Sequence, residues 1–171
     1  YNKEDIRQQK EETEYIEKPI MEEIVKHKEN KDIIGEDCFY SSGIFFRKEL
    51  TNPNSEFFLN RVSTYPKVEE VIDVIHQAGG KAFLAHPFEY KLENTINFIE
   101  ELRKKVILDG IECFHPSADE EKTEMLLKYA HTNKLYVSGG SDYHGKAKPD
   151  IEIGIGKGNL HIPTDIIKEW I

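Results

Sequence analysis

The stretches GGKAFLAHPFEY, residues 79–90, and DGIECFHPSADEEKTEMLLKYAHTNKLYVSGGSDYHG, residues 109–145, decide the fold of this chain. They contain short apolar runs, bounded by glycine, proline and polar residues, that are typical of buried β-strands. The predicted strands are residues 81–85, 110–114 and 134–137. Apolar residues at helical spacing predict helices over residues 68–77, 92–104 and 118–131. Helix and strand therefore alternate from Pro66 onward.

This alternation is typical of parallel α/β architecture. Roughly three βα units are too few for a closed eight-stranded barrel, so we expect an open sheet or one part of a barrel. Residues 1–65 have a different texture, helical and rich in aromatic residues. There the pattern predicts a short helix over residues 56–62, opened by the turn residues at 52–55. The sequence thus divides into a helical region, 1–65, and an α/β region, 66–171.

The bulk composition excludes several classes of protein. The chain has 171 residues, with 23 Lys and Arg against 32 Asp and Glu, which gives a net charge of −9. This acidic balance argues against broad contact with nucleic acid and suits a cation or a small substrate. The two cysteines, Cys38 and Cys113, form no paired motif, which favours a reducing cytoplasmic location. No apolar run is long enough to span a membrane.

Metal-competent side chains follow the predicted strands. His86 follows the first strand, His115 the second, and Asp142 and His144 the third. Because functional groups in parallel α/β folds gather at the carboxyl ends of the strands, we expect these side chains to share one site. Histidine nitrogen and aspartate oxygen are ligands of Zn, Mn and Fe. His86, Asp142 and His144 are therefore our candidate metal ligands.

Two further residues leave their roles open at this point. Glu112 lies inside the second strand, where it either serves the site or only bonds a neighbouring loop. His115 either binds substrate, orients a metal ligand, or is a turn residue. We assign His115 to the site as its candidate catalytic group.

The two quoted stretches, in this order, resemble the C-terminal half of the polymerase and histidinol phosphatase (PHP) superfamily. The resemblance runs from about Pro66 to Asn159 and is closest to metal-dependent phosphoesterases of small molecules. It implies a distorted (βα)7 barrel, represented here by its C-terminal part behind a helical insertion region, residues 1–65. It also implies two or three divalent metal ions, Zn, Mn or Fe, that activate water against a phosphoester. His86, Asp142 and His144 match the family's ligand positions.

Departures from the family pattern limit this expectation. None of the family's N-terminal ligand motifs, such as His-x-His, occurs before His86, so we expect a C-terminal fragment that is inactive alone. Phe88-Glu89 stands where relatives carry a basic pair, and Ala118 where they often carry a histidine. These changes keep two alternatives open: a degenerate binding or scaffolding module, and a related barrel hydrolase of C–N bonds. An incomplete barrel exposes strand edges, which favours a homodimer.

Overall fold

The computed structural model describes residues 17–60, 62–145 and 148–171. The chain divides into two compact units, Tyr1–Tyr65 and Pro66–Ile171. Each unit has its own apolar core. The assignment of the first unit as a helical insertion and of the second as half of a metal-hydrolase domain stays a prediction.

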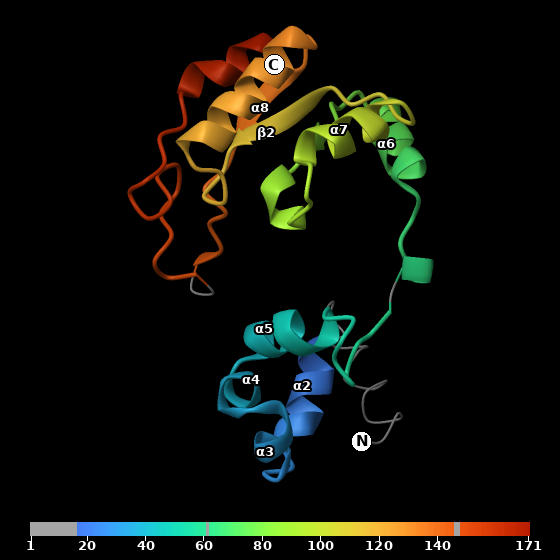
Figure 1. Ribbon diagram of the computed structural model, residues 1–171, viewed down its shortest axis with the longest axis vertical. Coiled ribbons are helices and arrows are strands. Elements are labelled where there is room, and N and C mark those ends of the chain that lie inside the picture. The colour runs from blue at the N-terminus through green and yellow to red at the C-terminus, as the bar shows by residue number, and fades with distance from the viewer. Residues whose placement is uncertain (1–16, 61, 146–147) are drawn as a thin grey trace. The chain divides into compact units, whose positions relative to one another are not determined.

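The N-terminal unit is a cluster of short helices (Figure 1). They are α2, Glu17–Val25; α3, Asn30–Ile34; α4, Glu36–Tyr40; α5, Ser42–Phe45; the π-helical turn η1, Phe46–Leu50; and the 3-10 turn η2, Val62–Thr64. Met21 and Ile24 of α2 pack in the core of this unit with the fully buried Phe45.

The helix predicted over residues 56–62 is wrong in the part that the structure describes. Turns and irregular chain occupy residues 52–60, and only the short η2 follows. The side chain of Asn52 accepts a hydrogen bond from the Asn54 N–H, and Ser55 Oγ accepts one from the Phe57 N–H. These side chains satisfy the backbone donors locally, which is how Asn and Ser compete with helix formation.

The C-terminal unit is a small parallel sheet with helices, as the alternating pattern predicts. Its elements are α6, Val68–Gln77; β1, Phe83–Leu84; η3, Pro87–Tyr90; α7, Thr95–Arg103; β2, Gly110–Phe114; α8, Glu120–Thr132; β3, Tyr136–Gly139; and η5, Thr164–Glu169. The strand order is β1-β2-β3, and both pairings are parallel. Figure 1 shows α8 lying along β2. The carboxyl ends of all three strands therefore meet at one edge of the sheet.

The core of this unit explains which elements form. Ile111 and Cys113 of β2 are fully buried and share a core with Ile99 of α7 and with Leu126 and Ala130 of α8. Polar side chains begin the two helices: Asn94 accepts from the N–H of residue 97, and Asp119 accepts from that of residue 122. Because such caps fix the first turn, α7 and α8 begin two or three residues later than their apolar patterns suggest.

Trp170 contacts the outer edge of β3 at one point. Trp170 donates its indole N–H to the Val137 carbonyl at 3.0 Å. Its ring also packs on Phe83, with centroids 5.0 Å apart. Since Trp170 is the only tryptophan in the chain, its fluorescence reports on this unit alone.

Asp109 ties the amino end of the sheet together. Its Oδ2 accepts the Ala82 N–H at 2.6 Å and lies 2.7 Å from His76 Nε2. Burial alone would raise the pKa of this carboxyl, but the bonds from His76 and Ala82 outweigh it, so the pKa lies below its ordinary value. The carboxylate form is therefore the stabilising one.

We expect Asp109→Asn to lower the free energy of unfolding of the C-terminal unit by about 1–2 kcal/mol at pH 6. Since the folded-state pKa of Asp109 is lowered from 3.8, its contribution is present above that pH and is lost as pH falls through the folded value. The difference from wild type should shrink below about pH 4. Urea unfolding followed by Trp170 fluorescence measures it, with the exposed Asp73→Asn as control. A difference that stays constant down to pH 3 would contradict this account.

Candidate metal centre

His86 lies at the end of β1 in a strained conformation. Its φ is +35° and ψ is 62°, in the left-handed region that residues other than glycine rarely adopt. Its backbone N–H donates to Glu112 Oε2 at 2.6 Å. Its Nδ1 is buried and has no hydrogen-bond partner among the described residues. Strained backbone and an unpaired buried nitrogen together are typical of a ligand position rather than a packing position.

Glu112 projects from β2 toward both neighbouring strand ends. One carboxylate oxygen holds the His86 backbone. The other oxygen, Oε1, lies close to Gly140. A side chain at that position would clash with it, because a Cβ there would stand only 2.6 Å from Oε1. Glu112 could either serve the site directly or bond a neighbouring loop, and the structure shows it bonding the end of the neighbouring strand β1. That bond positions His86.

His115 follows β2 and is 4% exposed. Its Nδ1 accepts the Ser117 N–H at 3.1 Å and lies 2.7 Å from Ser117 Oγ. Its Nε2 is buried without a hydrogen-bond partner in the described chain. The ring lies 5.5 Å from that of His86, centroid to centroid. His115 is thus buried beside His86 and is not an exposed turn residue.

Asp142 and His144 follow β3 and contact each other. His144 Nε2 lies 2.8 Å from Asp142 Oδ1, and the Lys148 ammonium binds the other carboxylate oxygen. Asp142 also has a left-handed backbone, with φ +56°. Burial would raise the pKa of Asp142, but the hydrogen bonds from Lys148 and His144 hold it below its ordinary value. Asp142 is partly buried, whereas half of the His144 side chain is exposed.

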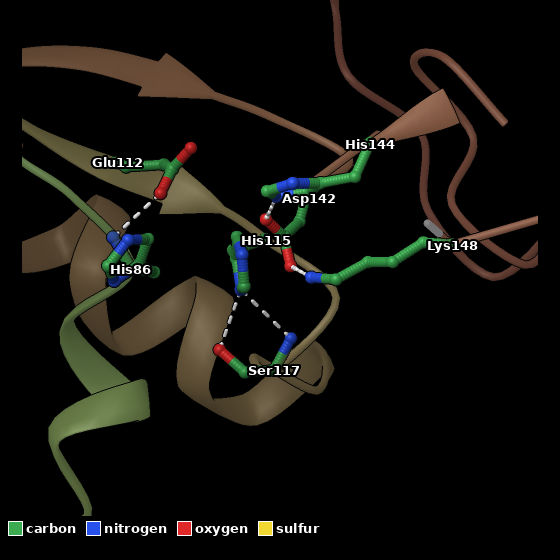
Figure 2. Close-up of polar contacts among 7 residues, drawn as sticks. All are labelled: His86, Glu112, His115, Ser117, Asp142, His144 and Lys148. Carbon is green, nitrogen blue, oxygen red and sulfur yellow. Dashed lines mark hydrogen bonds and ion pairs between the residues drawn. The ribbon is translucent and has the colours of Figure 1, made fainter. Parts of the chain in front are cut away.

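These residues form two groups at the carboxyl edge of the sheet. Figure 2 shows His86 with Glu112 on one side, Asp142 with His144 and Lys148 on the other, and His115 between them in this view. Within the described ranges no hydrogen bond or ion pair joins the two groups. Nor do three His, Cys, Asp or Glu side chains converge there into a ready metal site. Bringing the predicted ligands to one edge does not by itself assemble their coordination sphere.

The donor set nevertheless fits a divalent metal. His86 offers a buried nitrogen that no protein group in the described residues uses, and Asp142 and His144 offer an oxygen and a nitrogen two residues apart. These are borderline and hard ligands of the kind that Zn, Mn and Fe accept. The Lys148 ammonium sits on Asp142 where a metal cation would compete for it. These side chains therefore suit a divalent metal ion, provided that the ion displaces Lys148 from the Asp142 carboxylate.

Tyr90 and Ser117 contact residues of the candidate site, and the sequence did not single them out. The Tyr90 ring lies 6.1 Å from that of His86, and burial, followed by the charge of Glu112, raises the pKa of its phenol. Ser117 contacts His115 through both its hydroxyl and its backbone. Their positions in the sequence could have indicated them, because Tyr90 follows His86 by four residues and Ser117 follows His115 by two. Phe88, in the place of a basic residue, instead packs beneath Lys122.

Comparison with known proteins shows which enzymes this chain resembles. No family model matches the chain. It is 32% identical over 106 residues to the 5'-3' exoribonuclease Rnm of Escherichia coli, an alignment that covers 60% of this chain and 34% of the relative. It is 29% identical over 116 residues to the 3',5'-nucleoside bisphosphate phosphatase of Chromobacterium violaceum, covering 64% and 38%.

A solved structure supports the same class. The chain is similar, with a TM-score of 0.56 and 29% identity, to a metal-dependent phosphoesterase from Bifidobacterium adolescentis, over 75% of this chain and 43% of that one. The resemblance to PHP-type metal-dependent phosphoesterases is thereby confirmed, and its relatives are hydrolases. The α/β fold with a small parallel sheet is confirmed as well. The chain spans about a third of the length of the curated relatives it matches. A search of the described residues finds no helix able to cross a membrane.

Proposed function

We propose that this chain carries the C-terminal part of the metal centre of a phosphoesterase that hydrolyses a small phosphorylated molecule with metal-activated water. The observation that carries the proposal is the pair of buried, unpartnered imidazole nitrogens at successive strand ends, His86 Nδ1 and His115 Nε2. Each unpaired buried polar atom costs about 1–3 kcal/mol, so a fold retains such a pair where a ligand completes it. The phosphoesterase relatives support the same reading.

In this proposal His86, Asp142 and His144 hold metal, with His86 on a different ion from at least one of the other two. The complete centre would contain two or three divalent ions, Zn, Mn or Fe. Such ions lower the pKa of bound water and stabilise the charge of a phosphoryl group. Glu112 keeps the His86 backbone in place through its 2.6 Å hydrogen bond. His115 contacts the phosphoryl group, and Lys148, once released from Asp142, offers a cation to the same group.

The substrate class follows from charge and from the relatives. A chain with a net charge of −9 suits a small phosphorylated molecule that a few groups can hold. A second candidate is the 5' end of an RNA, favoured by the match to an exoribonuclease. An enzyme acting at a strand end needs few backbone contacts, so the acidic balance weighs less against it. Hydrolysis of a nucleoside bisphosphate, compared with that of a 5'-phosphorylated oligoribonucleotide, separates the two.

We also propose the architecture that the resemblance implies: residues 66–171 as part of a distorted (βα)7 barrel, and residues 1–65 as its helical insertion. The sheet supports the assignment to part of a barrel, because its three strands do not close on themselves and leave β1 and β3 as edges. An open edge favours a homodimer, which sedimentation analysis would detect as a species of twice the mass. Cys38 and Cys113 are buried and form no disulfide, which supports a cytoplasmic location.

We expect the 171-residue chain to bind divalent metal weakly and to leave p-nitrophenyl phosphate intact, because the described residues hold no three-ligand group. A longer protein that adds N-terminal ligands should retain at least one metal ion per chain. Elemental analysis after dialysis measures both. Rapid hydrolysis by the short chain would contradict its expected inactivity. Less than one metal ion per chain in the longer protein would instead favour a degenerate binding module.

A further inference from the structure

The environment of His115 determines where its proton lies. The Ser117 backbone N–H donates to Nδ1 at 3.1 Å. A backbone N–H has only a donor role, so Nδ1 must present its lone pair. A neutral imidazole carries one proton, and that proton must then be on Nε2. His115 therefore points an N–H group, not a lone pair, into the site.

The local sequence builds this arrangement. His115, Pro116, Ser117 and Ala118 form a turn in which the Ala118 N–H bonds the His115 carbonyl at 2.9 Å. Proline fixes φ at the second position of such a turn. Asp119 then caps α8 and anchors the far side of the turn. The Ser117 amide is thus held against the ring by the backbone, while its hydroxyl lies 2.7 Å from the same nitrogen.

His86 and His115 consequently differ in chemistry although their rings are 5.5 Å apart. No protein donor within the described residues contacts His86 Nδ1, so that nitrogen is open to a metal. His115 Nε2 carries a proton and could bind metal only by moving that proton to Nδ1, against the Ser117 N–H. A buried N–H without an acceptor instead fits an anionic oxygen.

We propose that Ser117 is a positioning residue, which fixes His115 as an Nε2–H donor to a phosphoryl oxygen of the substrate. The identity of the acceptor rests on the proposed function. The position of the proton does not, because it follows from the Ser117 contact alone.

Nitrogen NMR of the 15N-labelled 171-residue chain at pH 8 tests the position of the proton. His115→Gln identifies the His115 signals by their loss. We expect a proton on Nε2, an unprotonated Nδ1, and a coupling across the hydrogen bond between Nδ1 and the Ser117 amide nitrogen. A proton on Nδ1 in the wild-type chain would overturn the proposal.

Two Ser117 variants separate the hydroxyl from the backbone. Ser117→Ala keeps the N–H and should leave the proton on Nε2. Ser117→Pro removes the N–H and should populate the Nδ1–H tautomer, with Trp170 fluorescence to verify the fold. An unchanged tautomer in a folded Ser117→Pro variant would show that the Ser117 amide does not position the proton, which contradicts the inference.

Inorganic phosphate added to the zinc-treated chain tests the donor role. His115→Asn keeps an acceptor near the Nδ1 position but lacks Nε2, and we expect it to bind phosphate about tenfold more weakly. Equal affinity in variant and wild type would overturn that role. Absence of phosphate binding by the wild-type chain at a zinc concentration that saturates it would contradict the proposed function, whereas the nitrogen spectrum would still decide the position of the proton.

Discussion

Gly110→Ala should lower the free energy of unfolding of the C-terminal unit by at least about 3 kcal/mol, enough to unfold it in a modest concentration of urea. A Cβ at this position would stand 2.1 Å from the Phe83 ring and 2.7 Å from the backbone oxygen of Tyr136. The ring cannot simply turn away, because it packs on Trp170. The oxygen cannot move either, because it belongs to a strand paired with β2. Urea unfolding followed by Trp170 fluorescence gives the loss.

The matched control for this prediction is Gly43→Ala in the N-terminal unit. Its Cβ would meet only the end of the Arg47 side chain, at 3.7 Å. Since Trp170 reports on the other unit, this variant should leave the fluorescence transition unchanged. If the free energy of unfolding of Gly110→Ala lay within about 1 kcal/mol of the wild-type value, β1 and β3 would adjust around β2 more freely than their pairing suggests.

Asp142→Asn should weaken zinc binding by at least about a hundredfold, because loss of a metal ligand costs no less than loss of a group that only orients one. Asparagine tolerates the left-handed backbone of this position, so the change removes charge without straining the loop. Lys148→Met should act in the opposite direction. It removes the cation that binds the Asp142 carboxylate, and a partly exposed ion pair of this kind is worth about 0.2–1 kcal/mol. Zinc affinity should therefore rise by a factor of about 1.4 to 5.

Competition with a chromophoric chelator measures both affinities on the same chain. Asp150→Asn removes an exposed carboxylate from the same segment and serves as the charge-matched control. Opposite shifts in the two test variants, with no shift in the control, would establish Asp142 as a ligand that Lys148 masks. An Asp142→Asn affinity equal to that of the control would remove Asp142 from the proposed metal set.

The sequence predicts where the three strands lie, but β3, Tyr136–Gly139, begins two residues later than the predicted range 134–137. Residues 110–114 form β2 as expected, and Ile111 and Cys113 lie in the core. The first strand is shorter than its apolar run, since only Phe83 and Leu84 pair with β2. Near the C-terminus the chain forms a 3-10 turn over Thr164–Glu169. Where apolar burial decides the structure, periodicity is informative; at element ends, capping and local hydrogen bonds decide it.

The candidate site is less predictable for a physical reason. The sequence pattern can indicate that the metal-competent residues lie at one edge of the sheet, because each of them follows a predicted strand. The contact between Glu112 and the His86 backbone depends on the left-handed turn at His86 and on the pairing of β1 with β2. The Ser117 contact depends on a turn closed by one backbone hydrogen bond. Neither geometry leaves a periodic trace in the sequence.

Each unit contains one buried cysteine, whose rate of alkylation reports how often that unit opens. Cys113 lies in the middle of β2, fully buried, and burial raises the pKa of its thiol to about 12. Cys38 lies in the other core, where burial also raises the pKa of its thiol. Because only an exposed thiolate reacts with an alkylating reagent, each cysteine is labelled at the rate at which its own unit opens. Mass spectrometry of the two labelled peptides in one sample would show whether the units unfold together or separately.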